Sequence, residues 1–418
     1  MLVAHAAVGA QDWRDRFTAT FDEVWQTVYD THFDTTFGGV DWAAVKVELR
    51  PRVASATDQA AARGVIREML SRLGQSHFDL LSAAESEPDA PLGEATVLLD
   101  VRAIGGGMLV TRVAADSPAD RSGVRAGDQL VAVDGANLPN VGSALGSAAS
   151  RDRTIEAWLK VIRALSGKTG SLAHLRLVRP NGAEYAVDVL REVEPGEAVI
   201  LGNLPPMRAS LETNEVRTPS GKRVGVIAFN VWMAPLGEPI AQAIDRFRSA
   251  DGLVIALSGN VGGLVDMIRG VAGHIVNEPA VLGRMQMRSN TLEFRVNPRR
   301  ATSDGRRVVP FAGPVAIVVD GLTASASECF AASLQSLARA RVFGTTTMGQ
   351  ALPALTKNLP NGDVLLYAVG DFVTSDGRRV EGTGVVPDEV VPVDRAALAA
   401  GQNGRSQAIS WIDRGATH

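Results

Sequence analysis

The sequence has little of several features that would narrow its function at once. Its single cysteine, Cys329, has no second cysteine in the chain to form a disulfide with. Lysine and arginine number 42 against 46 aspartates and glutamates, so a formal net charge of −4 offers no basic footprint for nucleic acid. No run approaches the roughly 18 apolar residues that span a bilayer. These absences argue against a disulfide-stapled scaffold, a nucleic-acid-binding protein and an integral membrane segment.

Metal and nucleotide sites are also disfavoured. No two histidines have the spacing of zinc ligands; they are His5, His32, His77, His174, His274 and His418. The glycine-rich turn at residues 258–263 lacks the glycine spacing of a phosphate-binding loop, and no Gly-Lys-Ser/Thr follows it. We therefore expect no metal and no cofactor.

The length of 418 residues indicates more than one domain. Apolar residues at helical spacing, such as Phe17, Phe21 and Trp25, predict a helical N-terminal subdomain. We expect a leader remnant at 1–10, helices at 11–81, a linker at 82–94, a PDZ-like domain at 95–194, a β/α core at 195–400 and a tail at 401–418. The small residues of the first segment resemble a cleavage region, so we expect an extracytoplasmic, periplasmic or secreted protein.

The second domain is predicted from residues 108–135. A strand leads into a one-turn helix that ends at Gly123, and Gly127-Asp128 turns the chain into another strand that ends at the hairpin turn Asp134-Gly135. This stretch resembles a PDZ domain, with 154–165 as its peptide-binding helix. The loop before Leu98 lacks the glycines expected for receiving a peptide carboxylate.

The third domain is predicted from apolar runs that alternate with helical patterns. The runs 224–229, 253–257 and 315–319 are continuous enough to be strands buried on both faces. Residues 352–359 and 364–372 are expected to form a hairpin about Asn361-Gly362, whose edge suits an extended peptide. Residues from Arg395 onward read as a short helix with a frayed end. The expected class is a mixed α+β and α/β multidomain protein.

A polar corner joins the last of these strands to a helix, at Thr323-Ala324-Ser325-Ala326-Ser327-Glu328. Ser325 and Glu328 have the spacing of a capping box, which would be purely structural. A serine at a helix N-terminus can instead serve as a nucleophile, because the next backbone N–H, that of Ala326, can face a developing oxyanion. Cys329, one turn into the helix, is expected to be a small buried residue.

Together with 344–349 and the ending 375–388, this corner resembles the C-terminal-processing (tail-specific) serine peptidases. The resemblance implies a core of the crotonase-like type and Ser325 as nucleophile. In that family a lysine 25 residues downstream is the usual base, and Gln350 stands there instead. A glutamine amide cannot accept a proton at neutral pH. Lys357 is a weak substitute, seven residues further on.

The tricorn-core branch of the same superfamily uses a histidine, and its two motifs are similar to residues 73–77 and 380–388 of this chain. The resemblance implies that His77 is the base and that Ser76 and Glu381 orient it. Glu381 could otherwise be a surface carboxylate. The turn at 258–263 resembles the family's Asn-x-Gly-Gly, which implies that Gly262 or Gly263 adds a second oxyanion N–H. The family's arginine in this turn is replaced by Ser258.

We therefore predict a serine endopeptidase that cleaves unfolded or C-terminal protein segments through an acyl-enzyme. Two alternatives remain open. One is an inactive relative that binds a peptide or an apolar ligand, as the retinoid-binding members do, and the other is a PDZ-based scaffold. The expected partner is a protein or peptide substrate, and the sequence carries no indication of oligomeric state.

Overall fold

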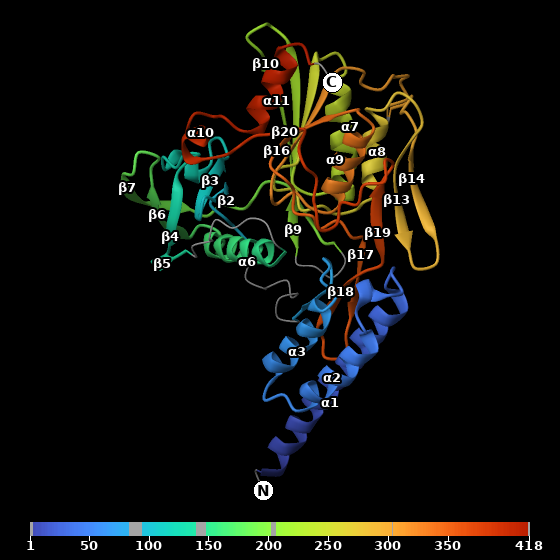
Figure 1. Cartoon of the computed structure of the whole chain (residues 1–418). Helices are drawn as coiled ribbons and strands as arrows, with labels where there is room; N and C mark the ends of the chain where they lie inside the picture. The colour runs from blue at the N-terminus through green and yellow to red at the C-terminus, as the bar shows by residue number, and fades with distance from the viewer. Residues whose placement is uncertain (1–2, 83–93, 139–147, 202–205, 303, 417–418) are drawn as a thin grey trace.

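The computed structural model describes residues 3–82, 94–138, 148–201, 206–302 and 304–416. Its helices are α1 (Val3–Thr31), η1 (Phe37–Gly39), α2 (Trp42–Ala54), α3 (Gln59–Ser71), α5 (Pro118–Arg121), α6 (Ala148–Leu165), η2 (Ala234–Leu236), α7 (Gly237–Arg246), α8 (Met267–Gly273), α9 (Ala326–Ser336), α10 (Arg395–Ala399) and α11 (Gly404–Asp413). Its strands are β1 (Asp79–Leu81), β2 (Leu99–Ile104), β3 (Gly107–Val113), β4 (Gln129–Val133), β5 (Ala136–Asn137), β6 (Leu172–Val178), β7 (Glu184–Leu190), β8 (Glu197–Val199), β9 (Met207–Ala209), β10 (Leu211–Arg217), β11 (Arg223–Phe229), β12 (Gly252–Ala256), β13 (Ala280–Met287), β14 (Thr291–Val296), β15 (Val315–Val319), β16 (Arg341–Gly344), β17 (Ala354–Asn358), β18 (Val364–Ala368), β19 (Gly370–Thr374) and β20 (Glu389–Val390). Figure 1 shows three bodies: the N-terminal helices, a small β domain and a larger β/α core.

The N-terminal helices α1, α2 and α3 pack on one another through a shared apolar cluster. Asp41 and Asp58 cap α2 and α3, because each carboxylate accepts a hydrogen bond from a backbone N–H three residues on, at 2.9 and 2.7 Å. Gly74, with φ of +61°, follows the end of α3 and turns the chain toward Ser76 and His77. The predicted linker at 82–94 lies almost wholly outside the described residues.

The small β domain has the strand order β2-β3-β4-β6-β7, with β5 paired to β4. Asp134 and Gly135 both have positive φ, 49° and 80°, as a type I′ hairpin turn requires. The helix α6 packs against β2, with Trp158 and Ile162 on the domain's apolar core. Residues 139–147 of this domain lie outside the described residues.

The core is built on a sheet of order β10-β11-β12-β15-β16-β20, parallel except for β10. The apolar strands β12 and β15 are buried along their whole length, since helices cover both faces of the sheet. One face packs on α7, α8 and α9. The other packs on α11 through Trp411 and Ile412. The nucleophile candidate Ser325 follows the carboxyl end of β15, where ligands bind in parallel sheets.

Two predictions for the C-terminal part need correction. The strand expected at 364–372 is interrupted after Ala368: β18 pairs with β17 and β1, whereas β19 leaves to pair with β13. The tail expected to be a short frayed helix contains α10 and α11 instead. Ile412 is fully buried against the central sheet, because the apolar side chains of α11 complete its second face.

The β17–β18 hairpin joins the N-terminal helices to the core. Asp363 beside its turn is buried and pairs with Arg63 of α3 at 2.8 Å, and Leu359 and Leu365 enter the apolar cluster of the helices. Figure 1 shows this hairpin extending from the core alongside α1 and α2. The contact fixes the helical body, and with it the turn after α3, relative to the core.

Candidate active site

Ser325 lies on a strained turn between β15 and α9. Its backbone has φ of 54° and ψ of −121°, a conformation that costs a non-glycine residue about 1–3 kcal/mol. Such a strand-turn-helix geometry projects a serine hydroxyl out of the backbone at the start of a helix. The expected capping box of Ser325 and Glu328 is present, with the Ser325 side chain facing the backbone N–H of Glu328. A hydroxyl oxygen that accepts there keeps its proton available to a base.

The other half of the box is Glu328, which is fully buried in the first turn of α9. Its carboxylate accepts hydrogen bonds from the N–H groups of Ser325, Gly349 and Gln350 at 3.0, 2.7 and 3.0 Å, and from the hydroxyl of Thr347. Burial raises the pKa of this carboxyl to about 7, while the donors oppose that shift. Four donors satisfy the ionised form, so Glu328 clamps the Ser325 turn to the segment 347–350.

The glycine-rich turn after β12 lies against Ser325. A side chain on Gly262 would start 2.6 Å from Cβ of Ser325 and 3.1 Å from the Ala326 nitrogen. The Gly262 N–H is already bonded to Asn260 Oδ1 at 3.0 Å. Within the described ranges the N–H groups of Gly263 and Ala326 donate to no other group. Of the predicted oxyanion donors, these two are available.

Ser76, His77 and Glu381 form one hydrogen-bonded chain across 305 residues of sequence. The Ser76 N–H and hydroxyl donate to the two oxygens of Glu381 at 2.8 and 2.9 Å. The Ser76 oxygen is also 2.7 Å from Nδ1 of His77. Glu381 is buried, with 6% of its surface exposed, and accepts a third bond from the Ala351 N–H at 2.9 Å. It is therefore not a surface carboxylate.

This chain assigns the tautomer of His77. A hydroxyl that donates to a carboxylate can only accept from the imidazole, so Nδ1 carries the proton and Nε2 keeps its lone pair. Burial lowers the pKa of the imidazole from 6.5 to about 4, so the ring is neutral at pH 7. His77 also has φ of +60°, uncommon for a non-glycine residue. The ring is thus held as a neutral base.

One peptide unit links the Ser325 turn to Glu381. The carbonyl of Gln350 accepts from the Ser325 N–H at 2.9 Å, and the N–H on the other side of the same peptide bond, that of Ala351, donates to Glu381. Gln350 therefore contributes its backbone at the position where the predicted family carries a lysine. No hydrogen bond joins the Ser325 hydroxyl to Nε2 of His77 in the described residues. Catalytic hydrogen bonds of unliganded enzymes are often long in this way.

Lys357 does not take the place of the missing lysine. It lies on β17, where its ammonium contacts the carboxylate of Glu23 and donates to the hydroxyl of Thr27 at 3.1 Å, both on α1. These contacts commit the Lys357 side chain to α1. Cys329 is buried in the core, as expected for a small apolar residue.

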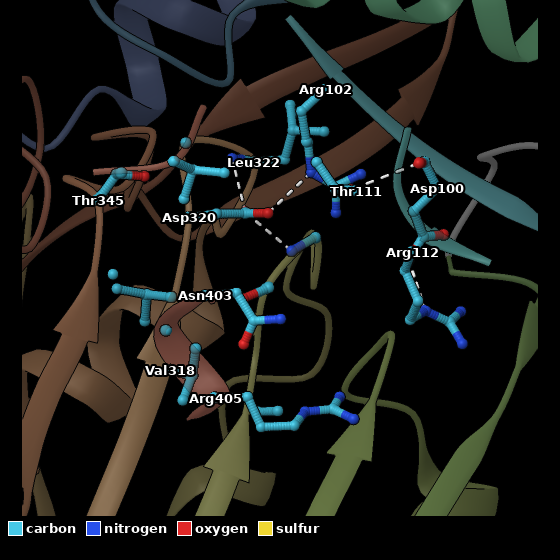
Figure 2. A pocket seen from close by; sticks show the side chains of 18 of the residues that line it. Asp100, Arg102, Thr111, Arg112, Val318, Asp320, Leu322, Thr345, Asn403 and Arg405 are labelled. Carbon is cyan, nitrogen blue, oxygen red and sulfur yellow. Dashed lines mark hydrogen bonds and ion pairs between the residues drawn. The ribbon is translucent and has the colours of Figure 1, made fainter. Parts of the chain in front are cut away.

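Sequence reasoning missed two residues that support the turns. Asp320, at the end of β15, accepts from the N–H groups of Gly259 and Leu322 at 2.9 and 3.0 Å. Arg102, which comes from β2 of the small β domain, binds Asp320 at 2.8 Å with 13% of its side chain exposed. Figure 2 shows this pair between the two bodies. The support expected from an arginine at 258 comes from another domain, so no local motif could reveal it.

A second support holds the His77 turn. His32, buried after α1, has its Nε2 3.1 Å from the Gln75 side-chain oxygen and its ring stacked on Phe78 at 5.4 Å. These contacts hold both sides of the Ser76-His77 dipeptide. In the sequence His32 was one of several scattered histidines, and nothing distinguished it.

Comparison with known families matches three parts of the chain to separate models. Residues 223–391, which contain Ser325 and Glu381, match peptidase family S41. This match spans most of the core. Residues 14–71 match the tricorn protease C1 domain and residues 109–179 match a PDZ domain. The chain is a serine-type peptidase with N-terminal helices and a PDZ domain.

Relatives cover most of the chain at low identity. A carboxyl-terminal-processing protease of a Picosynechococcus species is 26% identical over 387 residues, which span 90% of this chain and 84% of the relative. Carboxyl-terminal-processing peptidase 3 of Arabidopsis thaliana, named chloroplastic, is 24% identical over 381 residues, 88% of this chain and 68% of the relative.

Solved structures show the same fold. The photosystem II D1 C-terminal processing protease superposes with a TM-score of 0.57 at 21% identity, covering 92% of this chain and 96% of that one. Mature CPAF gives 0.64 at 15% identity, with 97% and 99% covered. The tricorn protease gives 0.51 at 16% identity, covering 96% of this chain and 37% of that one.

Two further observations concern membranes and metals. Within the described residues, no helix has the length and apolarity that a bilayer crossing requires. In the same part of the chain, no three or more His, Cys, Asp or Glu side chains are grouped closely enough to hold a metal ion.

Proposed function

We propose that the protein is a carboxyl-terminal-processing endopeptidase of the histidine-using, tricorn-like type, with a crotonase-like core. The observation that carries this proposal is the chain Glu381–Ser76–His77, which leaves Nε2 of the imidazole unprotonated, while the peptide unit of residues 350 and 351 bonds both Glu381 and the Ser325 turn. A structural hydrogen-bond cluster would have no need to fix the tautomer of a partly exposed imidazole. The names of the relatives support the choice of substrate, a peptide segment near a protein C-terminus.

The proposed reaction is acyl transfer to water. Nε2 of His77 takes the proton of the Ser325 hydroxyl as its oxygen bonds to the peptide carbonyl carbon, and the N–H groups of Ala326 and Gly263 receive the oxyanion. The imidazolium gives the proton to the leaving amine when the C–N bond breaks. Water then attacks the ester by the same route. Glu381, acting through Ser76, stabilises the charged ring.

The predicted extracytoplasmic location remains part of the proposal and is supported only by the small residues at the start of the chain. The division into domains is also part of the proposal, and the three bodies of the fold support it. Secretion of the protein by its native host, followed by fractionation, checks the location.

Covalent labelling with a fluorophosphonate tests the mechanism directly. We expect the wild-type protein to be labelled on Ser325, and the variants Ser325→Ala and His77→Ala to lose labelling while they keep their far-ultraviolet circular dichroism. Ser336→Ala, at the end of the same helix, is the matched control and should label normally.

Failure of the folded wild-type protein to label would overturn the proposed mechanism and favour a peptide-binding relative. Labelling that survives His77→Ala would remove the imidazole from its role as base. A labelled peptide that maps to another serine would remove Ser325.

A further inference from the structure

The side chain of Gln350 lies in the site, and the reaction described above does not use it. Its backbone is fixed on both sides. The N–H groups of Gln350 and Ser325 donate to the same oxygen of Glu328, each at 3.0 Å, and the Gln350 carbonyl accepts from the Ser325 N–H at 2.9 Å. The next N–H, that of Ala351, donates to Glu381. The Gln350 side chain therefore starts between the nucleophile turn and the Glu381 carboxylate.

Gln350 differs from its neighbours in burial. Residues 347–349 and 351–352 are buried, whereas Gln350 is half-buried. Ser325 and His77 are half-buried as well, so all three side chains have access to solvent. Among the residues that the structure describes, the Gln350 amide makes no hydrogen bond. An amide that is accessible and has no protein partner is available to a water molecule beside the nucleophile.

Other polar side chains that border the nucleophile turn are already engaged. Glu328 is fully buried and accepts from four donors. Thr347 is buried, and its hydroxyl donates to Glu328. Asn260 is buried too, and its amide bonds the backbone through both its nitrogen and its oxygen. Of these four side chains, Gln350 is the one whose polar atoms can reach a water molecule.

Hydrolysis of an acyl-enzyme needs a group with these properties. Water must bring its oxygen to the ester carbon while Nε2 of His77 takes one of its protons. The second hydrogen of the water needs its own acceptor, and both oxygens of Glu381 and the hydroxyl of Ser76 are already occupied. An amide oxygen can accept that hydrogen bond without taking the proton at neutral pH. A glutamine orients the attacking water in this way in some GTPases.

We propose that the side-chain amide of Gln350 orients the water that hydrolyses the acyl-enzyme. The water oxygen bonds to the ester carbonyl carbon and one proton passes to Nε2 of His77. The other hydrogen bonds to the Gln350 amide oxygen and stays with the product acid. When the tetrahedral intermediate collapses, its bond to the Ser325 oxygen breaks and that oxygen takes the proton back from the imidazolium. Gln350 is thus a catalytic residue of the second step alone, and this inference rests on the proposed peptidase function.

The variant Gln350→Met tests this, because it keeps the length of the side chain and removes both polar atoms. Fluorophosphonate labelling needs attack by Ser325 but no water, so its rate constant should stay within about threefold of the wild-type value. The butyryl group that p-nitrophenyl butyrate leaves on Ser325 should be lost roughly 10²-fold more slowly, as followed by mass spectrometry. Gln242→Met, at an exposed position of α7, is the matched control and should behave as wild type.

Hydroxylamine gives a second measurement on the same variant. It is a stronger nucleophile than water and does not depend on being oriented, so it should release the butyryl group from Gln350→Met nearly as fast as from the wild-type protein. If hydroxylamine is slowed as much as water, the side chain does not act on the water and the inference is wrong.

The inference is also overturned if Gln350→Met loses the butyryl group at the wild-type rate, or if labelling and butyryl loss slow by the same factor. In the second case the side chain would support the turn in both steps. These results leave the peptidase mechanism standing when the wild-type protein is labelled on Ser325. Absence of wild-type labelling removes the mechanism itself, and the role of Gln350 with it.

Discussion

Replacing Glu381 by glutamine tests the hydrogen-bonded chain Glu381–Ser76–His77 with little change in the shape of the side chain. The carboxylate accepts three hydrogen bonds, from the N–H and the hydroxyl of Ser76 and from the Ala351 N–H. A glutamine has one acceptor oxygen and an NH2 group that can only donate. If the NH2 faces Ser76, the hydroxyl must turn its proton toward Nδ1 of His77. The imidazole then takes the other tautomer and carries its proton on Nε2.

The wrong tautomer removes the base while the fold stays intact. In a serine triad of another protein, the corresponding change of a carboxylate to an amide lowers kcat about 10⁴-fold. For Glu381→Gln we expect a loss of roughly 10³- to 10⁴-fold in kcat/KM, which is about 4 to 5.5 kcal/mol of transition-state stabilisation. The rate constant of fluorophosphonate labelling should fall by a similar factor, since it also depends on a deprotonated Nε2.

The assay compares labelling rates and peptide hydrolysis across three proteins. Glu389→Gln is the control, because Glu389 lies on β20 and pairs with Arg341 outside the site. It should retain wild-type rates. If kcat/KM of Glu381→Gln falls by less than about tenfold while its melting temperature is unchanged, the tautomer argument is refuted. The imidazole would then work as a base without a carboxylate to orient it.

Three other changes have defined outcomes. Since burial lowers the pKa of His77 to about 4 and only the neutral ring is a base, kcat/KM should rise with pH through an apparent pKa well below 6.5, measured in a pH series. Gly262→Ala should cut labelling by about 10² to 10³-fold, because its Cβ would start 2.6 Å from that of Ser325. Arg102→Leu should slow labelling about tenfold, because Asp320 loses its cationic partner. Hydrogen exchange of the turn after β15 should become faster. Slow labelling with normal exchange would contradict this cause.

The sequence was most informative where a motif is local. The corner 323–328 and the hairpin turn Asp134-Gly135 take the conformations that their residues predict, because each depends on one or two backbone dihedrals. The position of Glu381 depended on resemblance. Its burial comes from hydrogen bonds to residues far away in the chain, and its neighbours Arg378 and Arg379 made a solvent-exposed carboxylate equally plausible.

The misses share a physical cause, which is that tertiary contacts override local pattern. The segment 364–372 is apolar enough for one strand, but β18 and β19 pair with different sheets, so the strand divides near Ala368. The C-terminal α11 looked frayed because its apolar residues are few. Trp411 and Ile412 are nevertheless sufficient to cover one face of the parallel sheet. Arg102 could not be placed because its partner Asp320 lies 218 residues away.

The separation between the base and the carboxylate that orients it has a consequence for biosynthesis. Ser76 is translated 305 residues before Glu381. A nascent chain that has not reached Glu381 holds an imidazole whose proton is free to sit on either nitrogen. If His77 is the base, as proposed, the hydrogen-bonded chain that orients it is completed only after Glu381 has been added, so we expect a nascent chain that lacks Glu381 to be unable to cleave itself or its neighbours.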